Sequence, residues 1–345
     1  MNRGAYRFEP VSDTVVRYGL GAIKGTGQGA IEAILEARGS TPFVSLFEFA
    51  ARVDRQRVNK RVVEALIKAG AFDALHGDRA SALASVSLAF DWAEAQEVNE
   101  HQGGLFDFAD SHAASTQEPA LVKAQAWSIK ERLTAEKAAL GFYLSGHLFE
   151  EYAPEVRRFV RKNIADLVDS REPQLLAGIV SDLRVVNGAR GRTAIFRLDD
   201  GSEYIEAVAN EELYDANRER LREDELVIIQ GKVQNDRFSG GLRLSCNTVW
   251  DLPSARSRFG RYLSVAVNGK VPPVADVIRT WPPRVLETDH GRTQQGLPIR
   301  LHLKRERAEG AIDLGDAARF WPSDEALARW RTLAHEGRAA VVYSD

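Results

Sequence analysis

The sequence predicts a multidomain α+β protein, and three observations support this fold class. The chain has 345 residues, whereas a typical domain has about 150, so two or three domains are expected. Apolar residues recur at helical spacing in the first half of the chain, and the pattern changes to that of strands from Pro173 onwards. Hydrophobic residues make up 44% and charged residues 28% of the chain, a balance that supports more than one buried core.

The composition excludes several classes of protein. Basic and acidic residues number 46 and 49, for a net charge of -3, so the chain as a whole is not a polybasic nucleic-acid binder. The single cysteine, Cys246, excludes an internal disulfide and any zinc site built on several cysteines. No signal-peptide pattern and no membrane-spanning apolar run is evident. We therefore expect a cytoplasmic protein.

Charge is unevenly distributed along the chain. Residues 51–70 carry six basic and two acidic side chains, and residues 80–122 carry seven acidic side chains and no Lys or Arg. Residues 251–310 carry eleven basic side chains against six acidic ones. Such alternation is typical of modules with different partners, and an uneven solvated surface is the alternative interpretation.

Helices joined by glycine-containing turns are expected up to Gly141. Asn59 is expected to cap a helix that runs to Ala69, with Gly70 just beyond its end. Residues 102–126 are rich in Gly, Ser, Ala and acids, which predicts a flexible connector. Further helices are expected at Ala30–Arg38, at 79–101 and at Ile129–Leu140.

Five strands are expected after Pro173, with a helix between the third and the fourth. The strands are predicted at Gln174–Val186, Thr193–Leu198, Tyr204–Ala209, Leu226–Asn235 and Leu242–Trp250, and the helix at Glu211–Arg222. This element order is that of an OB-fold barrel; an unrelated small α+β domain with the same order is the alternative. Barrels of this kind bind single strands with basic loops and aromatic platforms. The candidate DNA-binding residues are Arg190, Arg192, Arg237 and Phe238, whereas Phe196 and Tyr204 are either platforms or core.

A small α/β domain is expected at the end of the chain. Strands at Arg261–Val267 and Ile299–Leu303 are predicted to flank a helix near Pro273–Thr280. A last helix, Ser323–Ala334, and a closing strand at Val341–Tyr343 follow. Trp281, Trp321 and Trp330 are expected to be core or interface residues.

Two glycines one residue apart, Gly25 and Gly27, precede the first of these helices. Glycine allows the backbone angles of a tight turn, and exposed N–H groups at the start of the next helix then bind a phosphate. This pattern resembles the helix-hairpin-helix DNA-binding motif, in which alanine is common where Ile31 stands; a purely structural turn is the alternative. The implied DNA contacts are Lys24, Gly25, Thr26, Gly27 and Gln28, with Lys68 and Gly70 at a second, weaker turn.

A short motif lies inside the acidic connector. Gln102, Leu105 and Phe106 are similar to the clamp-binding peptide of bacterial DNA polymerases. Adjacent large apolar side chains in an acidic connector are costly unless a partner's groove buries them. A loop that packs on its own domain is the alternative.

Three segments resemble the C-terminal region of the alpha subunit of bacterial DNA polymerase III, the replicative polymerase: Tyr18–Gly25, Leu66–Asp73 and Ala135–His147. The resemblance implies four parts: the end of the fingers region with tandem hairpins (1–78), a helical connector with the clamp-binding peptide (79–171), an OB-fold (172–252) and a domain that binds the clamp-loader tau subunit (253–345). It also implies that the partners are DNA, the sliding clamp (beta) and tau.

The polymerase active site of the family is not recognisable here. It needs three aspartates that hold two metal ions, and the sequence contains no Asp-x-Asp. We therefore expect a non-catalytic C-terminal part of a DNA-directed DNA polymerase (a nucleotidyltransferase), with no catalytic residues, no metal site and no cofactor. The alternatives are a free-standing DNA-repair accessory protein and a nuclease with hairpin and OB modules.

Overall fold

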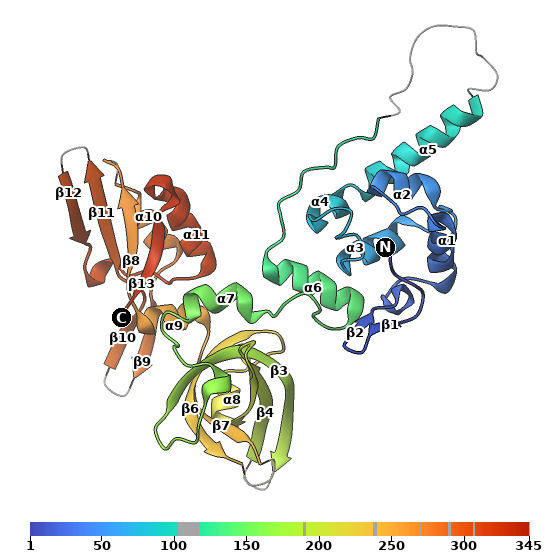
Figure 1. Ribbon diagram of the computed structural model, residues 1–345. Helices are drawn as coiled ribbons and strands as arrows, with labels where there is room; N and C mark the ends of the chain where they lie inside the picture. The colour runs from blue at the N-terminus through green and yellow to red at the C-terminus, as the bar shows by residue number, and fades with distance from the viewer. Residues whose placement is uncertain are drawn as a thin grey trace. The chain divides into compact units, whose positions relative to one another are not determined.

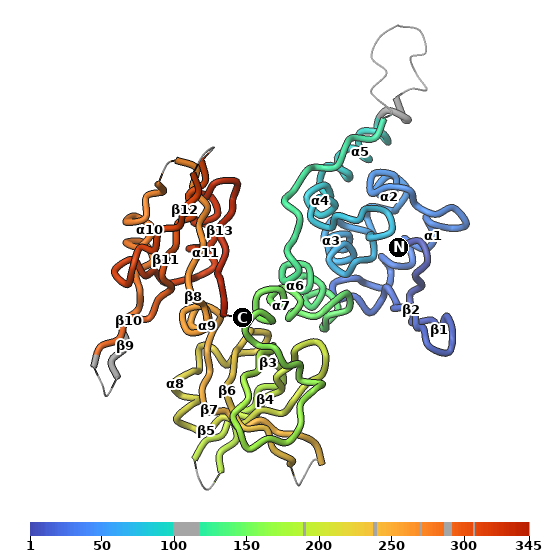
Figure 2. The backbone as a smooth tube through the Cα atoms, turned by 60° about the vertical axis from the view of Figure 1, so that its left-hand side comes forward, coloured from blue at the N-terminus to red at the C-terminus, as the bar shows by residue number. Residues whose placement is uncertain are grey.

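The computed structural model describes residues 1–102, 117–188, 191–236, 240–269, 271–288, 291–305 and 308–344. The chain divides into two compact units, Met1–His147 and Leu148–Asp345 (Figures 1 and 2). The second unit contains a barrel followed by a separate sheet. The predicted multidomain α+β class is therefore confirmed.

The first unit is built from helices. It begins with a short hairpin, β1 (Glu9–Ser12) and β2 (Val15–Arg17). Asn59 caps α3 by accepting from the Val62 N–H, and Gly141 ends α6 with a φ of 96°, as the sequence predicts. The helix expected over 79–101 is instead two helices that meet at Ser85. The helices are α1 (Gln28–Arg38), α2 (Leu46–Arg52), α3 (Lys60–Lys68), α4 (Arg79–Ala84), α5 (Val86–Gln102) and α6 (Ile129–Leu140).

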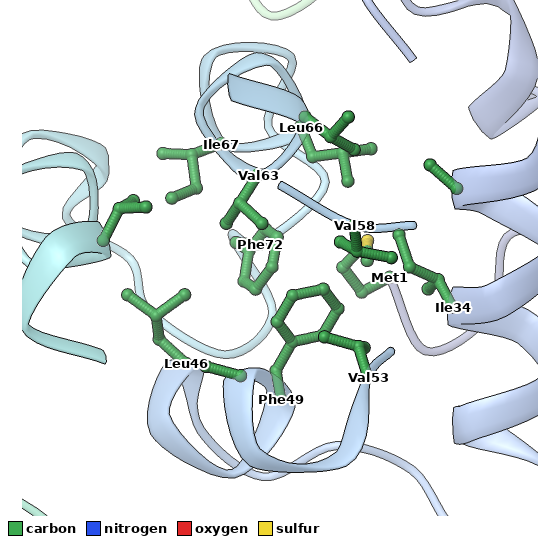
Figure 3. Packing of buried hydrophobic residues seen from close by; sticks show 14 of the residues in the cluster. Met1, Ile34, Leu46, Phe49, Val53, Val58, Val63, Leu66, Ile67 and Phe72 are labelled. Carbon is green, nitrogen blue, oxygen red and sulfur yellow. The ribbon is translucent and has the colours of Figure 1, made fainter. Parts of the chain in front are cut away.

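Aromatic and aliphatic side chains from these helices share one core. Figure 3 shows Phe49 and Phe72 packed edge to face, with ring centroids 5.0 Å apart. Ile31 is fully buried, so the larger side chain is accommodated where the hairpin family commonly has alanine. Residues from α4, α5 and α6 belong to the same cluster. The first compact unit therefore continues past residue 78 and ends at His147.

Part of the predicted flexible connector is bound to this unit. The Val122 N–H donates to the Ser85 hydroxyl at 2.8 Å, and the Ala124 N–H donates to the Ser81 hydroxyl at 3.2 Å. The Ser45 hydroxyl donates to the Glu118 carboxylate at 2.7 Å. Three serine hydroxyls of the helical unit therefore hold this part of the connector at Glu118, Val122 and Ala124.

The second unit contains a closed five-stranded barrel with strand order β3-β4-β5-β7-β6. The long first strand pairs antiparallel with both β4 and β6, and β5 and β7 pair in parallel to close it. This arrangement confirms the OB-fold. The helix predicted to end at Arg222 ends at Ala216, and Leu221 is buried in the barrel core. The elements are β3 (Gln174–Gly188), β4 (Gly191–Asp199), β5 (Tyr204–Asn210), α8 (Glu211–Ala216), β6 (Leu226–Asn235) and β7 (Leu242–Trp250).

The terminal domain has a four-stranded sheet with strand order β12-β11-β8-β13. Alternate residues of β8, such as Leu263 and Val265, form a core with Trp330 of α11. The strands predicted from apolar alternation are present, whereas the hairpin β9–β10 and the fully exposed β12 were not expected. The elements are β8 (Gly260–Val267), α10 (Val274–Thr280), β9 (Arg284–Thr288), β10 (Gly291–Gln295), β11 (Ile299–Arg305), β12 (Ala308–Asp313), α11 (Asp324–Leu333) and β13 (Ala339–Tyr343).

Two short helices flank the barrel in the chain: α7 (Phe149–Val156) precedes it, and α9 (Leu252–Phe259) connects it to the terminal sheet. The Arg256 guanidinium donates to both carboxylate oxygens of Glu155, at 2.8 and 2.7 Å. The Tyr343 hydroxyl donates to the same carboxylate at 2.6 Å. We call Glu155, Arg256 and Tyr343 the bracket, because they join α7, α9 and β13.

Candidate nucleic-acid interface

The first glycine turn is held by hydrogen bonds within the turn. It connects the short 3-10 helix Leu20–Ala22 to α1. Gly25 adopts a φ of 86°, a conformation that side chains other than glycine rarely adopt. The Thr26 hydroxyl donates to the Ile23 carbonyl at 2.6 Å and to the Leu20 carbonyl at 3.0 Å. These contacts fix the direction in which α1 begins.

The N-terminus of α1 is open to solvent. Gly27 is its N-cap, with no side chain to accept from the first N–H groups. Its carbonyl accepts from the Ala30 and Ile31 N–H groups, whereas the N–H groups of Gln28 and Gly29 donate to no acceptor among the residues that the structure describes. No atom lies within 4 Å of a Cβ built on Gly27 or Gly29. Two free donors at the positive end of a helix dipole can bind a phosphate oxygen.

Lys24 is placed next to this helix end. Its side chain is exposed, and its N–H donates to the Ala139 carbonyl of α6 at 2.8 Å. The Gln28 side chain instead donates to Glu32 at 2.7 Å. Of the predicted contact residues here, Lys24 supplies a cation, Gln28 supplies its backbone N–H, and Thr26 stabilises the turn.

The second glycine turn has the opposite polarity. Gly70 lies after the last residue of α3, with a φ of 80°. Its N–H donates to the Ile67 carbonyl, and the Ala71 N–H donates to the Leu66 carbonyl, which is the pattern of a Schellman C-cap. A helix C-terminus carries partial negative charge and disfavours a phosphate. The Gly70 N–H is already used within the chain. Of the two residues predicted to contact DNA at this turn, Lys68 is the one that could do so, through its side-chain ammonium.

Most cations of the basic block 51–70 are paired with acids of the same unit. Arg57 pairs with Glu36 at 2.9 Å, and Lys60 pairs with Asp91 at 3.2 Å. The remaining pairs are Arg52 with Glu48 and Arg55 with Glu97. The net positive charge that the sequence shows locally is thus largely compensated by α1, α2 and α5.

The two aromatic residues considered as stacking platforms on the barrel differ in exposure. Phe196 is only 1% exposed and belongs to the core, whereas Tyr204 is 50% exposed. The Arg197 guanidinium lies 4.6 Å from the centre of the Tyr204 ring, which is a cation–π geometry. Arg197 was not among the predicted residues, although its alternation with buried Phe196 and Leu198 along β4 is the signal that places it on the outer face.

Of the four barrel residues predicted to bind DNA, the structure describes only Arg192. Arg192 donates to Glu211 at 2.8 Å and to Asp215 at 2.7 Å, so its charge is compensated. The side-chain hydrogen bond with Glu211 and the nearby Asp215 raise the pKa of Arg192. Arg190, Arg237 and Phe238 lie outside the described residues.

The clamp-binding motif is described only at its first residue. Gln102 is the last residue of α5, and Leu105 and Phe106 lie outside the described residues. Within the described ranges, no group of three or more His, Cys, Asp or Glu side chains could hold a metal ion. None of the helices described is long and apolar enough to cross a membrane.

Comparison with known families agrees with this geometry. Residues 1–82 match a family model described as a helix-hairpin-helix motif, and residues 175–252 match the OB-fold nucleic acid binding domain. One solved structure with a similar barrel is the second OB-fold domain of replication protein A from Methanococcus maripaludis. It is 17% identical, covers 26% of this chain and 93% of that one, and has a TM-score of 0.22. The two family matches and the open helix N-terminus define a nucleic-acid-binding protein.

Similar sequences identify the family more narrowly. The chain is 36% identical over 336 residues to DNA polymerase III subunit alpha of Neisseria meningitidis, which is 96% of this chain and 28% of the relative. The Vibrio cholerae subunit is 36% identical over 356 residues, covering 100% and 30%, and the Escherichia coli K12 subunit is 33% identical over 343 residues, covering 96% and 29%. The chain belongs to the DNA polymerase III alpha family and corresponds to its C-terminal region. It spans 28 to 30% of the length of these relatives.

Proposed function

We propose that this chain is a non-catalytic part of a replicative DNA polymerase alpha subunit that binds DNA and tethers the polymerase to its processivity partners. It binds duplex through the first glycine turn and single strands on the barrel. It contacts the sliding clamp through Gln102, Leu105 and Phe106, and the clamp-loader tau subunit through the terminal domain. It acts in the cytoplasm and needs no cofactor of its own.

The open N-terminus of α1 is the observation that supports duplex binding best. The N–H groups of Gln28 and Gly29 lie at a helix end with no capping side chain, and the exposed Lys24 precedes this helix by four residues. Contacts of this kind address phosphates and do not read bases. If about three or four phosphates are neutralised, log affinity plotted against log salt concentration falls with a slope near -3 for duplex. Titration of a labelled duplex at several salt concentrations tests this; a flat response contradicts the proposal.

Tyr204 and Arg197 support single-strand binding on the outer face of β4 and β5. An exposed aromatic ring offers a stacking surface to any base. The adjacent Arg197 pairs with Asp182 at 2.8 Å, so we expect the ring to contribute more than the guanidinium. Arg190, Arg237 and Phe238 lie outside the described residues and are proposed as further single-strand contacts from the sequence alone.

The clamp contact is proposed from the motif alone. A peptide this short buries little area, so its own affinity is expected to be roughly micromolar or weaker. Because the hairpins and barrel hold the DNA that the clamp encircles, clamp binding becomes intramolecular, with an effective concentration near the millimolar range. Weak contacts can then maintain a long-lived complex that still releases.

Changing Leu105 and Phe106 together to Ala tests this tether. The double substitution removes two apolar side chains and costs roughly 2–5 kcal/mol of clamp binding. Capture of purified sliding clamp should be lost, while duplex affinity and thermal stability stay unchanged. If the variant captures the clamp as well as the parent chain does, the peptide is not the tether. If a domain unfolds instead, the two side chains are ordinary packing.

A further inference from the structure

Two of the segments that resemble the polymerase family, Leu66–Asp73 and Ala135–His147, contact the glycine turns of the first unit. Gly70 engages its N–H within the chain, and the Ala139 carbonyl of α6 accepts the Lys24 N–H. Both segments meet at one buried side chain, Arg79, which is 8% exposed.

Arg79 uses its whole guanidinium. Its Nε and Nη2 atoms donate to the two carboxylate oxygens of Asp73, at 2.7 and 2.6 Å. Its Nη1 atom donates to Glu136 at 3.2 Å and to the Lys68 carbonyl at 3.3 Å. A Cβ on Gly70 would lie 2.3 Å from Nη2. The second turn therefore requires glycine partly because Arg79 occupies the space beside it.

Glu136 continues the network on the side of α6. It is fully buried, and its second oxygen accepts from the Leu144 N–H at 2.7 Å and from the Ser145 N–H at 2.8 Å. Burial alone would raise the pKa of this carboxyl, but the hydrogen bonds from Ser145, Leu144 and Arg79 lower the pKa overall. Glu136 is thus charged at neutral pH and fixes the chain that follows α6.

The same helix contacts the first glycine turn. Ala139, three residues after Glu136, accepts the Lys24 N–H at 2.8 Å. The Lys24 ammonium also lies 3.5 Å from a Cβ built on Gly141, which ends α6. Glu136 and Ala139 are one helical turn apart, so a displacement of α6 at Glu136 moves the carbonyl that holds Lys24.

We infer that Arg79 and Glu136 are positioning residues for the duplex-binding turn at Lys24–Gln28. They touch no DNA themselves. They hold α6 at the place where its Ala139 carbonyl fixes the Lys24 backbone, and they thereby orient the N–H groups of Gln28 and Gly29. This inference rests on the proposed duplex binding by the first turn.

Three variants of the full chain separate positioning from plain stability. Glu136→Gln keeps the shape and removes the charge. The double variant Arg79→Met with Glu136→Met replaces the ion pair by apolar side chains, a change that is often neutral or stabilising for buried pairs. Gly27→Val alters the turn directly. Each is titrated with a labelled duplex and a labelled single strand, and its thermal midpoint is measured.

Glu136→Gln should weaken duplex binding about tenfold, the equivalent of one charge-assisted hydrogen bond, while single-strand affinity stays within about twofold of the parent chain. The double variant should keep a thermal midpoint close to that of the parent chain and still bind duplex weakly. If the double variant recovers duplex affinity together with stability, the pair only stabilises the fold and the inference is wrong. If Glu136→Gln does not fold, the double variant alone decides.

The two proposals fail in different ways. If Gly27→Val weakens duplex binding and neither Glu136→Gln nor the double variant does, the positioning role is wrong and duplex binding by the turn stands. If Gly27→Val leaves duplex binding intact, the proposed function of the turn is wrong, and the positioning role is wrong with it.

Discussion

The two glycine turns of the first unit are similar in sequence and opposite in structure. Gly25 and Gly27 precede a helix, and the N–H groups of its first two residues, Gln28 and Gly29, have no acceptor within the described part of the chain. Gly70 follows a helix, and the N–H groups around it donate to carbonyls of that helix. Both Gly25 and Gly70 have a positive φ, so backbone conformation alone does not distinguish them. What a glycine turn offers a ligand depends on which end of a helix it forms.

Gly70→Ala should produce the largest effect, and the effect should be on stability. The new Cβ meets Arg79 at 2.3 Å in a backbone conformation that disfavours alanine. We expect a loss of about 2–4 kcal/mol in the free energy of unfolding, from overpacking and backbone strain together. Urea unfolding measures it. Gly77→Ala is the control, because its Cβ meets nothing within 4 Å. Equal losses of unfolding free energy in both variants would show that Gly70 has no special structural role.

Gly27→Val should have the complementary effect, on binding. Gly27 has a φ of -77° and a ψ of 155°, a conformation that valine adopts readily. The side chain would shield the free N–H groups, so duplex affinity should fall about ten- to a hundredfold, the range of hydrogen bonds to a charged group. Fluorescence anisotropy with a labelled duplex measures this, with Gly77→Val as the matched control. If the unfolding midpoint of Gly27→Val falls as far as that of Gly70→Ala, the two turns do not differ in the way proposed.

The barrel offers the same contrast between a free and an engaged group. Tyr204→Ala removes an exposed ring and should weaken single-strand binding about five- to tenfold. Arg192→Ala removes a cation already paired with Glu211 and Asp215, and we expect a change below about threefold. Parallel titrations of one labelled single strand compare the two variants. A larger loss for Arg192→Ala would show that its ion pairs open to bind DNA.

The smallest expected effect is on the stability of the folded chain at acid pH. Because the pKa of Glu136 is lower in the folded chain than its ordinary value of 4.5, its contribution to stability is complete above that value. It is lost as the pH falls through the lowered pKa. Glu136→Gln should therefore flatten the decline of the unfolding free energy below about pH 4.5. Urea midpoints measured between neutral and acid pH test this, and parallel curves for the two proteins would contradict it.

The sequence predicted best those elements whose signals are local. The helix expected at Ile129–Leu140, with Gly141 after it, is α6 to the residue, and β6 and β7 also have the bounds that the strand pattern predicts. The buried Arg79 could not be predicted, because its partners Asp73 and Glu136 are 6 and 57 residues away. The basic block misled for the same reason: the acids that pair with Arg55 and Lys60 come from α5.

The bracket of Glu155, Arg256 and Tyr343 has a mechanical consequence. Arg256 is 3% exposed and donates to Glu155 with both ends of its guanidinium fork, and Arg158 adds a hydrogen bond to the Val341 carbonyl at 3.0 Å. The bracket therefore couples the last strand of the terminal sheet to α7 and α9, so a displacement of β13 is transmitted to both helices.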